Sequence, residues 1–189
     1  MKKTYVYIDK LYKESLFDVG IVEENIHMLF YSFLAFFLPL MLGHPQWLVG
    51  IIVNAYLILG ATYLRGYKLL PLILLPSLGV LTAGLIFGNY TIFLVYLIPF
   101  IWIGNAMYVY AYKHLQFIKM NKIFSVIGAS GLKATFLFLS ALFLVNLGII
   151  PEVFLTPMGI LQLVTAITGG IVAVTIITGR EKIKNIKVV

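Results

Sequence analysis

Six long apolar runs alternate with short polar or charged segments along this chain. Each run approaches the roughly 20 helical residues that cross a hydrocarbon core of about 30 Å. The pattern therefore predicts six transmembrane helices, over residues 27–42, 47–64, 69–87, 91–112, 130–149 and 156–178. Pro71, Pro76 and Pro99 fall inside these runs. Membrane helices tolerate proline where neighbouring groups satisfy the freed backbone.

Two segments are too charged to be spans. Residues 1–25 carry nine charged side chains among scattered apolar ones, which predicts either a short amphipathic helix on the inner surface or a solvated tail. Residues 113–128 form a basic connection that we expect to lie along the inner surface or to receive a partner protein. The rest is one transmembrane domain, residues 26–180, followed by a basic tail, residues 181–189.

All fourteen Lys and Arg residues fall into four clusters, and successive clusters are far enough apart for the chain to cross a bilayer twice. The clusters are Lys2, Lys3, Lys10 and Lys13; Arg65 and Lys68; Lys113, Lys119, Lys122 and Lys133; and Arg180, Lys182, Lys184 and Lys187. The turns between them, near residues 43–46, 88–90 and 151–157, contain neither residue. Because cytoplasmic loops are enriched in Lys and Arg, we expect an all-α bundle in the plasma membrane with both termini in the cytoplasm.

Composition agrees with this class. Hydrophobic residues make up 61% of the chain and charged residues 11%, whereas a soluble domain is about half apolar and a quarter charged. The net charge of +7 is accounted for by loops that face anionic lipid headgroups, so we expect no nucleic-acid partner. The chain has no cysteine, which excludes disulfides and thiolate metal sites.

The sequence favours no catalytic centre. Residues 128–131 read Gly-Ala-Ser-Gly, the nucleophile pattern of intramembrane serine proteases, but a serine nucleophile needs a base within hydrogen-bond reach. No histidine lies on a later span; the three are His27, His44 and His114. Asp9 and Asp18, the only aspartates, are in the N-terminal segment. We therefore expect no enzyme activity, no bound metal and no cofactor.

Lys133 is the only candidate for a charge within the membrane. If its helix begins near Ser130, its side chain reaches the inner interface. If the helix begins near Ile123, Lys133 is buried and functional. The expected span length favours the interfacial position.

Uncharged polar residues and aromatic residues in the spans and outer turns are the candidates for substrate binding. They are Gln46, Trp47, Asn54, Tyr96, Asn105, Asn146, Gln162 and Thr165. Thr168 follows Thr165 on roughly the same predicted face, and the outer turns add His44, Asn89, Tyr90 and Glu152. Each residue alone is as well explained by helix–helix hydrogen bonds or the interfacial aromatic belt. Together they predict a small pocket with apolar walls in the outer half of the bundle.

The expected ligand follows from the charges of the outer half. A bound anion usually needs Arg or Lys, and the interfacial position of Lys133 leaves none there. The sequence therefore favours a neutral or weakly cationic ligand whose flat ring stacks on Trp47, Tyr90 or Tyr96. The competing hypothesis is that Lys133 reaches the pocket and binds an anion.

Three stretches resemble the substrate-binding S-component of energy-coupling-factor (ECF) vitamin transporters. They are residues 43–55 (GHPQWLVGIIVNA), residues 98–106 (IPFIWIGNA) and residues 157–170, which begin PMGILQL and end in Gly-Gly. The resemblance implies a six-helix protein that binds a vitamin-like small molecule for uptake. It also implies a scaffold membrane subunit and a pair of ATPases as partners, consistent with the lack of a Gly-rich phosphate loop in this sequence.

Two features depart from that family. The first span of S-components commonly carries a stripe of small residues for docking to the scaffold, whereas this one offers only Ser32 and Ala35 among aromatic residues. The metal-transporting members have a histidine-containing N-terminus, whereas this chain begins Met-Lys-Lys-Thr, so no metal substrate is expected. The alternatives are a structural or assembly subunit without ligand and a self-contained small transporter or channel.

The predicted topology can be tested with single cysteines, because the natural chain has none. A cysteine at Gln46 or Asn89 should react with a membrane-impermeant thiol reagent in intact cells, and one at Lys119 should react only after lysis. Labelling at Lys119 in intact cells would overturn the orientation.

Overall fold

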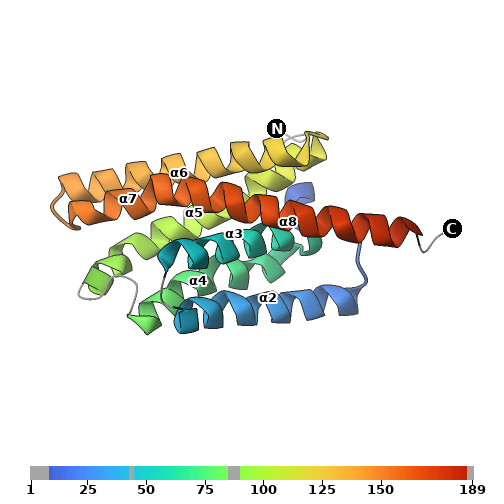
Figure 1. Cartoon of the computed structure of the whole chain (residues 1–189), viewed down its shortest axis with the longest axis horizontal. Helices are drawn as coiled ribbons and strands as arrows, with labels where there is room; N and C mark the ends of the chain where they lie inside the picture. The colour runs from blue at the N-terminus through green and yellow to red at the C-terminus, as the bar shows by residue number, and fades with distance from the viewer. Residues whose placement is uncertain (1–8, 43–44, 85–89, 187–189) are drawn as a thin grey trace.

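The chain folds into a bundle of helices that lie roughly along one axis (Figure 1). This computed structural model describes residues 9–42, 45–84 and 90–186, and within them all regular structure is helical. Within the part of the chain that the structure describes, six helices are long and apolar enough to cross a membrane. In chain order the elements are α2 (Ile21–Leu42), α3 (Gln46–Tyr63), η1 (Gly66–Leu69), α4 (Leu70–Ala83), α5 (Thr91–Phe117), α6 (Lys122–Asn146), η3 (Glu152–Phe154), α7 (Leu155–Met158) and α8 (Ile160–Ile186). The expected all-α fold is confirmed, and the described residues contain six candidate spans by length and composition.

Several helices extend beyond their apolar runs. The α5 helix continues to Phe117 and α6 begins at Lys122, so only four residues connect them. The prediction of a surface segment over residues 113–128 was therefore wrong. The cause is a local cap: the side chain of Asn121 accepts a hydrogen bond from the backbone N–H of Ile123 at 2.9 Å and starts the helix early. The α8 helix likewise continues to Ile186 through most of the predicted basic tail.

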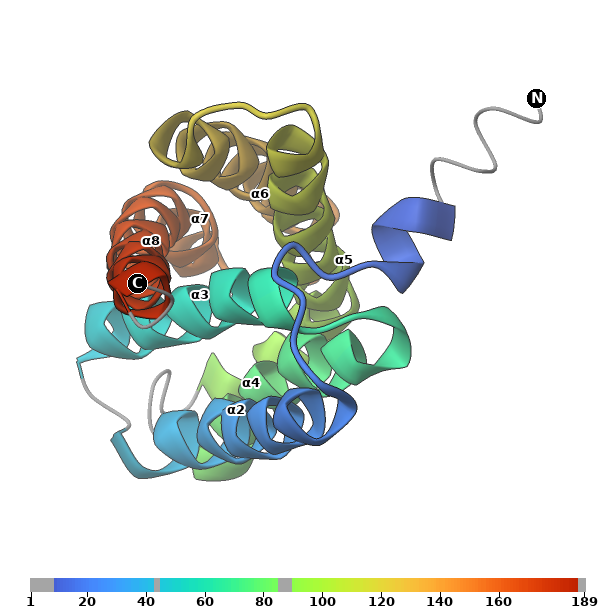
Figure 2. The same ribbon diagram turned by 90° about the vertical axis from the view of Figure 1, so that its right-hand side faces the viewer.

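The helices form three rows, which are clearest when the bundle is viewed from its end (Figure 2). The α3 and α5 helices lie between the α2–α4 pair on one side and the α6–α8 pair on the other. The α3 and α8 helices pack closely because Gly169 has no side chain. A Cβ atom there would overlap the carbonyl oxygen of Ile51 and lie 2.9 Å from the backbone nitrogen of Ala55.

The described basic residues gather at one end of the bundle, with one exception. The start of α2, the α3–α4 connection, the α5–α6 connection and the end of α8 all lie at that end (Figure 1). Lys133 is the exception, because it lies eleven residues, roughly 16 Å, into α6. Lys2, Lys3, His44, Asn89 and Lys187 lie outside the described residues. We call this end the basic end, and its assignment to the cytoplasm remains a prediction.

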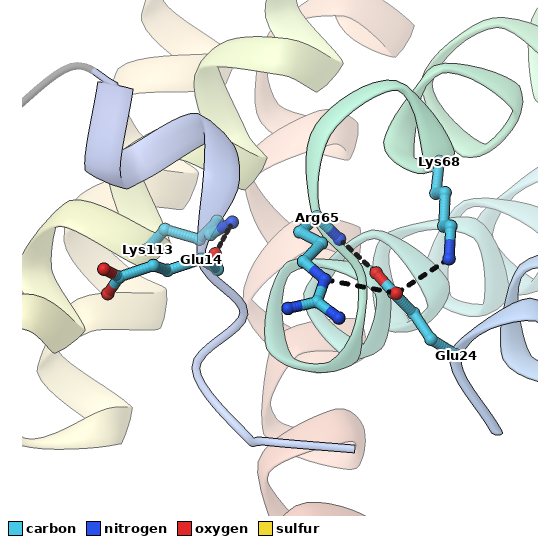
Figure 3. A network of polar contacts seen from close by, with 5 residues as sticks. All are labelled: Glu14, Glu24, Arg65, Lys68 and Lys113. Atoms are coloured by element: carbon cyan, nitrogen blue, oxygen red, sulfur yellow. Dashed lines mark hydrogen bonds and ion pairs between the residues drawn. The ribbon is translucent and has the colours of Figure 1, made fainter. Parts of the chain in front are cut away.

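A buried carboxylate joins α2 to the α3–α4 connection at the basic end (Figure 3). Glu24 on α2 is 1% exposed and accepts hydrogen bonds from the Nζ of Lys68 at 2.7 Å and from the backbone nitrogen of Arg65 at 3.0 Å. The Nε of Arg65 adds a third at 3.2 Å. Because two cations and a backbone donor surround one carboxylate, its burial is compensated and α2 is held to the corner between α3 and η1.

The segment before α2 crosses the same end of the bundle. Lys113 on α5 is fully buried and its Nζ donates to the backbone oxygen of Glu14 at 2.6 Å (Figure 3). The backbone N–H of Phe17 donates to the carbonyl of Thr62 at 2.9 Å. These contacts hold the N-terminal segment across α3 and α5 at the basic end.

Two apolar clusters fill the bundle, and buried polar residues lie between them. The cluster nearer the basic end includes Tyr63, Tyr112 and Ala173. The other includes Leu97, Leu137 and Phe154. Asn105 on α5 and Lys133 on α6 each fall between members of the two clusters along their helix, and Thr165 on α8 falls between Met158 of α7 and Ala166 of α8. The interior is therefore polar at about half its height.

The close contact of α3 and α8 predicts that Gly169→Ala destabilises the fold by roughly 1–3 kcal/mol, because the added methyl group meets backbone atoms that cannot move away. Gly131→Ala is the matched control, since a Cβ atom there meets nothing within 4 Å. Detergent-solubilised variants can be compared by thermal unfolding. Equal melting temperatures for the two variants would contradict the close contact.

Candidate functional site

A cavity of about 100 Å³ opens between the helices toward the end opposite the basic end. A water molecule needs roughly 10–15 Å³ in the same measure, so the cavity has room for several waters or a small organic molecule. Residues of α3, α4, α5, α6, α7 and α8 line it, and its walls are mostly apolar. Its polar lining residues are Gln46, Asn54, Ser77, Asn105, Lys133, Gln162 and Thr165.

Lys133 is the centre of the polar lining. Its side chain is 2% exposed, and its Nζ donates a hydrogen bond to the Oδ1 of Asn54 at 2.7 Å. The Nζ also lies 5.3 Å from the centre of the Tyr108 ring. No carboxylate lies within ion-pair distance of it among the described residues. A buried ammonium is costly without compensation, so the amide oxygen and the ring face are what stabilise it within the protein.

Asn54 connects α6 to α8 through α3. Since its Oδ1 faces the donor-only ammonium, its Nδ2 must serve as the donor. That nitrogen donates to the carbonyl of Gly50 at 2.9 Å and to the Oγ1 of Thr165 at 3.3 Å. The Oγ1 of Thr165 in turn donates to the carbonyl of Leu161 at 2.8 Å. The result is a continuous chain of hydrogen bonds, buried at the floor of the cavity.

Asn105 has a different role, which is to hydrogen-bond the turn of α4 before Pro76. Pro76 has no N–H, so the turn before it loses a helical hydrogen bond. The Nδ2 of Asn105 donates to the carbonyl of Ile73 at 3.1 Å, and the Nε1 of Trp102 donates to the carbonyl of Leu74 at 3.2 Å. The neighbouring helix α5 thus donates two hydrogen bonds to carbonyls in the turn of α4 before the proline. The carbonyl that the missing N–H of Pro76 leaves without a helical donor is that of Leu72, one residue earlier.

The start of α8 also borders the cavity. Gly159 separates α7 from α8 with φ −105° and ψ −102°, which interrupts the helix. The first backbone hydrogen bond of α8 runs from Leu163 to the carbonyl of Gly159 at 3.1 Å. Leu161 and Gln162, in this first turn, line the cavity. The Oε1 of Gln162 is buried and has no hydrogen-bond partner among the described residues.

The structure brings together five of the eight predicted site residues. Gln46, Asn54, Asn105, Gln162 and Thr165 line the one cavity. Trp47 and Tyr96 are each 52% exposed, and Asn146 is exposed as well, so none of these three lines it. Thr168, Tyr90 and Glu152 are exposed too.

For Trp47 and Tyr96 the reason is helix phase, whereas Asn146 is the last residue of α6. The α3 residues that line the cavity follow a spacing of three and four along one face, from Gln46 through Val49 and Gly50 to Asn54. Trp47 is one residue, about 100°, off that face. Tyr96 is similarly out of phase with Leu94 and Asn105 on α5. The chemical type of these residues does not indicate the helix face on which they lie.

The expected interfacial position of Lys133 was wrong. Because α6 begins at Lys122, Lys133 lies near the middle of a helix of 25 residues, and its side chain is part of the cavity lining. The signal that was missed is Asn121, a helix-capping residue type directly before the apolar run. A neutral ligand stacked on Trp47, Tyr90 or Tyr96 is also no longer expected, because Lys133 lines the cavity and those rings do not.

A double-mutant cycle tests the Lys133–Asn54 hydrogen bond. Asn54→Leu should destabilise the protein by roughly 3–5 kcal/mol, because it leaves a buried ammonium without an acceptor. Lys133→Met should lower the free energy of unfolding by about 1–3 kcal/mol, because it leaves only the neutral amide oxygen of Asn54 without a donor. The double variant should lie within about 1 kcal/mol of the wild type. Titration with sodium dodecyl sulfate in mixed micelles, followed by circular dichroism, measures all three; additive losses would exclude the coupling.

No protein-family model matches this chain, and no curated protein or solved structure matches it either. The geometry of the cavity and the sequence resemblance are therefore the grounds for a functional interpretation.

Proposed function

We propose that this protein is the membrane-embedded substrate-binding subunit of an uptake system for a small, vitamin-like molecule. The observation that carries the proposal is the cavity, which joins a buried hydrogen-bond network to mostly apolar walls. Small-molecule sites commonly have this composition, with a few polar groups that orient the ligand. The site lies at about half the height of the bundle, where many membrane transporters bind their substrates.

The asymmetry of the bundle supports binding from one side. At the basic end, ion pairs and the N-terminal segment tie the helices together. The cavity lies toward the opposite end, where described residues of the turns carry no Lys or Arg. With the predicted orientation, a substrate enters from outside the cell and the closed end faces the cytoplasm.

Partner subunits supply the energy in this proposal. The sequence has no Gly-rich phosphate loop, and the resemblance to S-components implies a scaffold subunit and a pair of ATPases. On α2, Ala35 is fully buried while Phe30 and Phe33 are more than half exposed. A scaffold that docks on α2 would therefore meet aromatic side chains in place of a stripe of small residues.

Filling the cavity tests the proposal against an assembly role without ligand. Leu161→Trp places a bulky ring in the lining, whereas Ile160→Trp changes a neighbouring residue that is 61% exposed. Native mass spectrometry of protein purified in mild detergent should detect a bound small molecule in the wild type and in Ile160→Trp, and lose it in Leu161→Trp.

Two outcomes would contradict the proposal. If wild-type protein binds nothing from a cell extract and Leu161→Trp folds and assembles like the wild type, the cavity has no ligand and an assembly role is favoured. If the purified protein alone drives substrate or ion flux across liposomes, it is a self-contained transporter or channel.

A further inference from the structure

Lys133 has hydrogen-bonding capacity that the described residues do not use. An ammonium carries three N–H donors, and the structure shows one acceptor for it, the Oδ1 of Asn54. The ring of Tyr108 covers another side of the ammonium at 5.3 Å. Since the side chain is 2% exposed, the remaining donor capacity is directed to the cavity that Lys133 lines and not to bulk solvent.

Lys133 is the one ionisable residue among the described residues that line the cavity, and none of them is Asp or Glu. The described carboxylates that pair with cations, such as Glu24 with Lys68 and Glu181 with Lys122, are at the basic end. Buried cations in membrane proteins usually pair with an anion or with several carbonyl groups. Among the described residues Lys133 has one hydrogen-bond acceptor, the Oδ1 of Asn54. A ligand can therefore supply a further acceptor or an anionic group.

The start of α8 adds to the positive potential. Its first turn, with Leu161 and Gln162, borders the same cavity, and a helix N-terminus carries about half a positive charge. Interrupted helices place such N-termini at the anionic groups of substrates in membrane transporters. The buried ammonium and the helix N-terminus therefore favour the same sign of ligand charge.

We propose that the cavity binds a small organic acid, with its carboxylate on the Nζ of Lys133 and its apolar part between Val53, Met158 and Leu161. This rests on the proposed function and specifies its substrate class. The apolar walls disfavour strongly hydrated inorganic anions, because these would lose hydration without gaining enough new partners. The unpaired Oε1 of Gln162 would accept a hydrogen bond from a donor group elsewhere on the ligand.

Matched acids and amides test this assignment. The full chain is placed in nanodiscs of zwitterionic phosphatidylcholine, and binding is measured by calorimetry with a panel of small aliphatic and aromatic carboxylates, each paired with its neutral amide. Wild-type protein should bind at least one acid about tenfold or more tightly than its amide. The preference should disappear in the Asn54→Leu/Lys133→Met double variant, which is expected to keep its stability. The exposed-site variant Lys182→Met should retain the preference.

Each other outcome overturns the inference. Equal binding of acids and amides, or an acid preference that survives loss of Lys133, would make Lys133 a structural residue. Displacement of the acid by phosphatidylglycerol would show that Lys133 binds a lipid phosphate. Tighter binding of inorganic phosphate than of any acid would show that Lys133 binds a free phosphate ion. No binding from the panel would exclude small acids. A neutral or cationic molecule that co-purifies, and is lost in Leu161→Trp, would overturn the acid and leave the proposed function intact.

Discussion

The hydrogen bond between Lys133 and Asn54 is the constraint on which the middle of this bundle depends. An ammonium in the interior of a membrane protein is unfavourable unless it has partners, because neither lipid nor packed apolar side chains can replace its hydration. Asn54 on α3 accepts a hydrogen bond from Lys133 on α6 and so holds α6 in register. Asn54 also donates a hydrogen bond to Thr165 on α8. Three helices from distant parts of the sequence are thus aligned by one network.

Close helix packing makes that network possible. Gly50 lies opposite Thr165, with its missing Cβ leaving room for the hydroxyl, and Gly169 admits the backbone of α3. Tyr108 completes the layer, since its hydroxyl donates to the carbonyl of Ala166 at 2.7 Å while its ring lies beside the ammonium. Small residues at helix contacts are typical where packing, and not the hydrophobic effect, holds membrane helices together. The hydrogen bond between Asn54 and Thr165 therefore depends on the close packing of α3 against α8.

The two ends of the bundle are built differently, and the difference bears on function. The basic end is held by ion pairs, including Arg180 with Glu23 and Lys122 with Glu181, and by the N-terminal segment. Toward the other end the interruption at Gly159 and the turn at Pro76 leave space that side chains do not fill. A substrate-binding protein needs such an opening on one side and a closed floor on the other.

The sequence by itself determined the number of candidate spans, the helical class and the gathering of most basic residues at one end, because apolar length and loop charge are local properties. It also supplied most of the polar residues of the cavity. Only the tertiary structure decided the position of Lys133, since this depends on where α6 begins relative to its apolar run and on which helix faces it. The same reason separates Gln46, which lines the cavity, from its neighbour Trp47, which faces outward. Their chemistry is local, but the face on which each lies is set by the packing of α3 against α2, α4, α5 and α8.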